Sequence, residues 1–189
     1  MSEKIEIKEL NSFSDFIRIH NMYRELSSKT KYFFTYPVFS WSPMSMNPIL
    51  WILGNIALIL SLSPLKKIVW LLFPKAHYLL VGAFYSNKLV GVTFLFKFDR
   101  SNRQVIARNF GIVVRDEYQG KGVGSKLIQK LFSIAKEKYH INEIYLEVLT
   151  DNKVAIKFYK KYGFQIIGTI ERSNQKYFKM KKVLKGVQK

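Results

Sequence analysis

One stretch of the chain, residues 110–127, joins a strand pattern, a glycine-rich loop and a helix start, and it limits the fold more than any other. The β-branched run Ile112, Val113 and Val114 predicts a strand that leads into the loop. Glycines follow at 120, 122 and 124, directly before an amphipathic helix pattern. Such a loop points backbone N–H groups and the positive end of the helix dipole at one place, and the missing Cβ atoms let a bulky anion come close. We therefore expect this stretch to hold a phosphate or pyrophosphate.

The rest of the chain predicts an α+β fold around this stretch. Sequence patterns indicate strands at 4–9, 78–84, 89–98, 104–114, 143–148, 164–170 and 176–183, and helices at about 12–27, 123–139 and 152–162. Strands that follow one another through short turns pair antiparallel, whereas the helix after the glycine loop joins two strands that run in parallel. The expected architecture is a single domain over 1–189, with a mixed, mostly antiparallel sheet, a central parallel pair and flanking helices.

Residue types narrow the class of site. The chain has no cysteine and only three scattered histidines, so we expect no metal cofactor. The 31 Lys and Arg against 13 Asp and Glu give a formal charge of +18, which favours anionic partners such as CoA, nucleic acid or an anionic membrane surface. The N-terminal residues carry no apolar signal-peptide region, so the expected location is cytoplasmic.

A hydrophobic segment at about 36–75 interrupts the pattern. It holds all five prolines, all three tryptophans and an apolar run at 49–60. As a helix that run would be roughly 20 Å long, whereas a membrane span needs roughly 30 Å. We expect a helical insertion, and three interpretations stay open: packing on its own domain, a peripheral membrane contact, or a homodimer interface.

Two common phosphate loops fit the glycine pattern poorly. A Walker loop ends in Gly-Lys-Ser/Thr, but here Ser125 and Lys126 follow Gly124 in the reverse order. A dinucleotide fingerprint needs its glycines directly after the strand, but residues 115–119 intervene. An acyl-CoA pyrophosphate site is the third interpretation.

Two sequence blocks carry a family resemblance. The run Gln119-Gly120-Lys121-Gly122-Val123-Gly124 resembles the (Q/R)-x-x-G-x-(G/A) signature of the GNAT superfamily of acetyl-CoA-dependent N-acetyltransferases. A downstream block, which runs from Leu146-Glu147-Val148 through Asn152 and Tyr159 to Gly163-Phe164, resembles that family's second conserved block. Two blocks in the right order are far more specific than one glycine pattern.

The resemblance implies acetyl-CoA as co-substrate, transferred by direct attack in a ternary complex. It assigns the pantetheine arm to the strand backbone, which needs a free strand edge and therefore a bulge near 109–111. The residues it assigns to the cofactor are Ile112, Val113, Val114, Gln119, Gly120, Lys121, Gly122, Val123, Gly124, Ser125 and Asn152.

The resemblance also assigns two catalytic residues. Tyr159 matches the tyrosine whose hydroxyl protonates the leaving thiolate, and Glu147 matches a position that is the general base in some members and structural in others. A simpler interpretation is that Tyr159 only packs and Asn152 only caps its helix. Asp116 is interpreted as a solvated turn residue.

The acceptor is the least constrained part of the site. No acidic residue occurs from Leu26 to Phe98, the region expected to wall the acceptor, so we expect an apolar or anionic amine of a small molecule or protein rather than a polycation. A second class stays open: a GNAT-like binding protein with weak or no catalysis that engages nucleic acid or a membrane surface. No nucleic-acid-binding motif supports it, so we do not expect a nucleic-acid partner.

Overall fold

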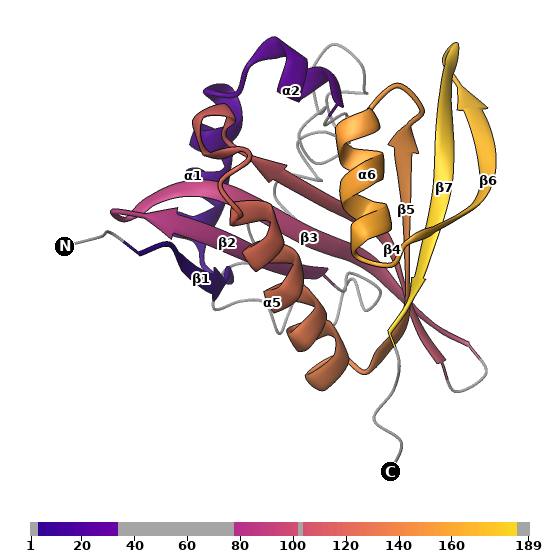
Figure 1. Ribbon diagram of the computed structural model, residues 1–189. Helices are drawn as coiled ribbons and strands as arrows, with labels where there is room; N and C mark the ends of the chain where they lie inside the picture. Colours follow the sequence, from indigo (N-terminus) through magenta and orange to yellow (C-terminus); the bar gives the residue numbers. More distant parts are fainter. Residues whose placement is uncertain (1–3, 34–77, 102–103, 185–189) are drawn as a thin grey trace, which may run out of the picture.

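The protein is described by a computed structural model that covers residues 4–33, 78–101 and 104–184. Seven strands form one sheet in the order β1-β2-β3-β4-β5-β7-β6 (Figure 1). All neighbouring strands pair antiparallel except β4 and β5, which pair in parallel. The predicted α+β class and central parallel pair are therefore confirmed.

The elements lie close to the ranges that the sequence predicts. The strands are β1 (Glu6–Glu9), β2 (Tyr78–Tyr85), β3 (Lys88–Ser101), β4 (Gln104–Val114), β5 (Ile141–Leu149), β6 (Gln165–Arg172) and β7 (Gln175–Val183). The helices are α1 (Phe13–Arg24), α2 (Ser28–Phe33), α5 (Val123–Glu137), α6 (Lys153–Lys161) and a 3-10 turn η1 (Asp116–Tyr118).

The first helix ends slightly before its predicted end, and a second short helix follows it. Ser12 begins α1 through a reciprocal capping box with Asp15, as the sequence indicates. The helix ends at Arg24, and the Ser27 hydroxyl then accepts the Thr30 N–H at 3.2 Å to start α2. The short second helix therefore lies beyond the predicted helix of about 12–27, where the sequence analysis places no element.

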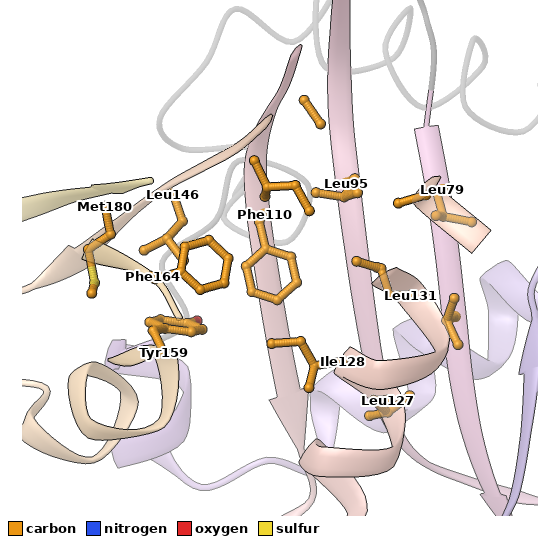
Figure 2. Packing of buried hydrophobic residues seen from close by; sticks show 14 of the residues in the cluster. Leu79, Leu95, Phe110, Leu127, Ile128, Leu131, Leu146, Tyr159, Phe164 and Met180 are labelled. Carbon is orange, nitrogen blue, oxygen red and sulfur yellow. The ribbon is translucent and has the colours of Figure 1, made fainter. Parts of the chain in front are cut away.

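Helices cover both faces of the sheet, because side chains alternate along each strand. On β2, Leu79, Val81 and Ala83 join the core under α5 and α6, whereas Leu80 and Phe84 pack with α1 on the opposite face. Figure 2 shows Phe110, Ile128 and Leu131 in the first of these cores. Because both faces of the central strands are buried, these strands form a rigid support for what lies at their ends.

The parallel pair opens soon after it forms. β4 and β5 pair only from Val105 to Ala107 on β4. Beyond this, Asn109 forms an extra residue opposite β3, with a φ of 59°, which confirms the bulge predicted at this place. From residue 108 onwards, β4 therefore forms no ladder pairs with β5, and this edge of β4 is open.

The hydrophobic segment 36–75 lies outside the described residues, so its three interpretations and the single-domain assignment stay predictions. No helix in the described ranges has the length and apolarity needed to cross a bilayer.

Candidate active site

A cleft of about 1080 Å³ opens where β4 and β5 separate. Its walls come from α2, the end of β4, the glycine loop, the end of β5 and α6. Figure 1 shows α2 and the start of α6 at the same end of the sheet as the loop before α5. Most predicted site residues line this cleft: Ile112, Val113, Val114, Gln119, Gly120, Gly122, Gly124, Ser125, Glu147, Asn152 and Tyr159.

Two predicted cofactor residues are not part of the cleft lining. Val123 is the first residue of α5 and is buried in the core. The Lys121 ammonium lies over the Tyr118 ring, 5.6 Å from its centroid. Any contribution of these two residues to cofactor binding stays a prediction.

The glycine loop is shaped by its backbone. Gly120 and Gly122 have φ values of 72° and 78°, a left-handed region that favours glycine, and a Cβ at either position would meet open space. Gly122 is the N-cap of α5 and provides no side-chain cap. The first N–H groups of α5 therefore stay available to an anion at the cleft, which fits a pyrophosphate.

The third glycine lies beside α6. A Cβ on Gly124 would lie 3.4 Å from the Phe158 ring of α6, an ordinary van der Waals contact. The start of α5 and α6 therefore lie side by side at the cleft, and Gly124 lines it.

Tyr159 combines burial with access to the cleft. Its side chain is 7% exposed and packs edge-on against Phe110 and Phe164, with ring centroids 5.7 Å away in both cases (Figure 2). Among the described residues, none hydrogen-bonds its hydroxyl. Burial raises the pKa of Tyr159 far above its usual value, so the hydroxyl keeps its proton. A protonated, unengaged hydroxyl at a cleft can act as a proton donor.

Asn152 caps α6, as one of the two interpretations expects. Its Oδ1 accepts the Ala155 N–H at 3.1 Å. It also lines the cleft, so its assigned contact with the cofactor stays a prediction.

Glu147 has a partner that the sequence does not reveal. Its two carboxylate oxygens accept hydrogen bonds from the Arg172 guanidinium at 2.8 and 3.2 Å. Arg172 ends β6, and both side chains line the cleft and are partly exposed. The carboxylate thus sits at the cleft paired with a cation. Across the described residues, no group of three or more metal-ligating side chains could hold a metal ion.

Asp116 is exposed but is more than a solvated turn residue. It accepts the Ser27 N–H at 3.0 Å, the Ser27 hydroxyl at 2.8 Å and the Thr30 hydroxyl at 2.6 Å. Partial burial raises the pKa of the Asp116 carboxyl, but the hydrogen bonds from Thr30 and Ser27 outweigh this effect and hold the pKa below its ordinary value. Asp116 therefore joins α2 to the loop that leads into the cleft.

Gln119, a predicted cofactor residue, is engaged in the same contact. Its amide donates to the Val114 carbonyl at 3.0 Å and to the Thr30 hydroxyl at 3.3 Å. The side chain thus links the end of β4 to α2 directly before the glycine loop, at the cleft lining.

The mixed sheet opens at its parallel pair, and a glycine loop at a helix N-terminus lies beside the opening. These features agree with the class of acetyltransferases that the two sequence blocks resemble. The chain belongs to the acetyltransferase (GNAT) family, whose family model matches residues 55–164. It is an N-acetyltransferase of this family, because several curated relatives of the chain are named as such.

Two curated relatives are named as acetyltransferases of different amines. The chain is 32% identical over 105 residues to a spermine/spermidine N(1)-acetyltransferase of Bacillus subtilis, which covers 53% of this chain and 68% of the relative. It is 40% identical over 70 residues to an L-amino acid N-acetyltransferase of Escherichia coli, covering 37% of this chain and 43% of the relative.

Solved structures support the fold. A GNAT-family acetyltransferase from Streptococcus pneumoniae matches with a TM-score of 0.66 and 21% identity, over 95% of this chain and 99% of the other. A spermidine N-acetyltransferase from Vibrio cholerae, solved with CoA and spermine, matches with a TM-score of 0.65 and 20% identity, over 95% of both chains.

Proposed function

We propose that this enzyme transfers an acetyl group from acetyl-CoA to a primary amine by direct attack in a ternary complex. The observation that carries the proposal is the cleft itself, which brings the glycine loop, the open edge of β4 and the Tyr159 hydroxyl together. Holding two substrates in one cleft supplies much of the rate of a direct transfer.

The cleft residues fit the parts of CoA. The free N–H groups at the start of α5 suit the pyrophosphate, and Lys29 and Lys161 add positive charge to the lining. The edge of β4 beyond its bulge offers backbone groups to the pantetheine amides. When bound, acetyl-CoA supplies the thioester that is attacked and a thiolate that must leave.

Tyr159 is the proposed general acid. A tyrosine hydroxyl carries its proton at neutral pH, as a donor to a departing thiolate must, and burial raises the pKa of Tyr159 further. The rings of Phe110 and Phe164 fix the tyrosine ring, so the hydroxyl is held in place before the reaction.

Glu147 is the proposed general base, acting directly or through a water. Glu147→Gln keeps the shape and an acceptor for Arg172 but removes the basic oxygen, and we expect kcat to fall about 100-fold with CoA affinity unchanged. Steady-state rates and calorimetric CoA binding measure both quantities.

Arg172→Gln is the matched control for Glu147. It breaks the same partly exposed ion pair, which is worth only about 0.2–1 kcal/mol, and leaves the carboxylate in the cleft. If Glu147 were only structural, the two variants would lose the same small activity, and the assignment as base would be wrong.

For the acceptor we propose an apolar or anionic amine. Of the acidic residues in the described cleft lining, Asp116 is bonded to α2 and Glu147 to Arg172, which leaves no spare carboxylate there for a polycation. A polyamine is the second candidate, because one relative at 32% identity is named a spermine/spermidine acetyltransferase.

Release of free thiol from acetyl-CoA tests the function. The purified enzyme is supplied with spermidine, with an amino acid and with a peptide that has a free N-terminus, each against a no-amine control. We expect amine-dependent release with the amino acid or the peptide. Release with spermidine alone would select the second acceptor. No release with any amine, together with no CoA binding, would favour the binding-protein class.

A further inference from the structure

The short helix α2 reaches both walls of the cleft. Lys29, Thr30 and Phe33 line the cleft from α2. Near its C-terminal end, the Tyr32 hydroxyl donates to the Asp151 carboxylate at 3.5 Å and accepts from the Gln175 amide at 3.4 Å. At its N-terminal end it is bonded to the loop between β4 and α5. The helix thus connects the glycine loop to the ends of β5 and β7.

Within the described part of the chain, hydrogen bonds of Thr30 and Tyr32 join α2 to its surroundings. None of its residues is buried. A hydrogen bond adds only about 0.5–1.5 kcal/mol net, and segments held in this way open more easily than core elements. The position of α2 therefore depends on its few polar contacts.

The preceding helix is anchored differently. The buried Arg115 guanidinium pairs with Glu25 at the end of α1 and donates to the Leu89 carbonyl at 2.9 Å. Two α1 side chains, Ile19 and Met22, are also buried in a core cluster. Any movement of α2 is consequently expected to pivot near Ser27, where the two helices meet.

The contacts at the N-terminal end of α2 come from the residues that flank the glycine loop. Thr30 lies at the centre, because its hydroxyl donates to Asp116 at 2.6 Å and accepts from Gln119 at 3.3 Å. Gln119 directly precedes Gly120, and Gly120 and Gly122 both have left-handed φ values in the loop. An anion bound by the loop backbone restricts the loop, and with it the two side chains that hold Thr30.

We propose that Asp116, Thr30 and Gln119 couple occupancy of the glycine loop to the position of α2, so that CoA binding fixes the acceptor-side wall of the cleft. Thr30 and Asp116 are thus positioning residues, which act through α2 and touch no reacting atom. The proposal rests on the proposed function, because it takes the loop to bind CoA. By linkage, an acceptor that contacts the fixed α2 tightens CoA by the same factor by which CoA tightens the acceptor.

Hydrogen–deuterium exchange with and without CoA tests the coupling. In the wild type, we expect CoA to slow exchange in the peptide that covers 119–125 and, about tenfold, in the peptide that covers 28–33. Thr30→Val keeps the branched shape but removes the hydroxyl. We expect it to keep the loop protection and to lose the CoA-dependent protection of α2. Thr30→Ser restores the hydroxyl and with it the protection.

The outcomes separate the coupling from the function beneath it. Protection of α2 by CoA in Thr30→Val as strong as in the wild type, or loop protection without α2 protection in the wild type, overturns the coupling and leaves the function intact. Protection of neither segment means that the loop does not bind CoA, and the proposed function fails first. Asp116→Ala, which removes three hydrogen bonds to the same turn, gives a second variant with the same expectation.

Discussion

Replacing Tyr159 by phenylalanine is expected to lower kcat by about 1,000-fold and to leave CoA affinity unchanged. The substitution removes only the hydroxyl, which none of the described residues hydrogen-bonds. The aromatic contacts with Phe110, Phe158 and Phe164 stay in place. The expected loss of rate therefore reflects the missing proton transfer to the leaving thiolate. Assays of thiol release measure kcat, and calorimetric titration measures CoA affinity.

Tyr162→Phe is the matched control. Tyr162 follows the end of α6, packs at a tilt against Phe158 with ring centroids 4.9 Å apart and is not part of the cleft lining. We expect Tyr162→Phe, which also removes a hydroxyl, to leave kcat unchanged. Equal rates in both variants and the wild type would remove Tyr159 from the mechanism.

Burial of Tyr159 also predicts a direction for stability at high pH. Because its pKa is raised in the folded state, the neutral hydroxyl favours folding below the unfolded value of about 10, and this contribution is lost as pH rises from there through the folded value. Tyr159→Phe has no hydroxyl to ionise. We expect its thermal midpoint to fall less steeply than that of the wild type above about pH 10.

Gly122→Glu is expected to abolish CoA binding without unfolding the protein. A carboxylate about 4 Å from a phosphate costs about 4 kcal/mol at an effective dielectric constant of 20, which is nearly 1,000-fold in affinity. In the wild type, CoA at 100 times its Kd adds about 2.7 kcal/mol of stability, a rise of roughly 5–10 °C in Tm. We expect this rise to vanish in the variant.

Gly122→Gln separates the charge from the strain. Both side chains are of the same size and force the same left-handed backbone at a φ of 78°, so the free variants should unfold at the same temperature. The glutamine variant should bind CoA more tightly than the glutamate variant does. Equal affinities would mean that no phosphate lies near residue 122.

Local patterns predicted the core of the site. The strand, glycines and helix of residues 104–137 are set by neighbours in sequence, and the structure has β4 and α5 close to the predicted ranges, with Gly122 as the N-cap of α5. The contacts of Asp116 could not be predicted in this way, because its partners Ser27 and Thr30 lie 89 and 86 residues away in the chain. The pairing of Glu147 with Arg172 likewise depends on how β6 and β7 fold back beside β5.

The short parallel seam between β4 and β5 has a consequence for how the enzyme tolerates change. Few backbone pairs join the two halves of the sheet there, so aromatic side chains also hold them together. Phe110 of β4 stacks on Phe164, with ring centroids 5.6 Å apart, and Tyr159 packs against both rings. The Tyr159 ring thus helps to hold the two halves of the sheet together, whereas the fold does not need the Tyr159 hydroxyl. A natural Tyr159→Phe substitution is therefore expected to remove activity and leave a folded protein. A small residue at position 159 is expected to remove the aromatic packing between the two halves of the sheet as well as the activity.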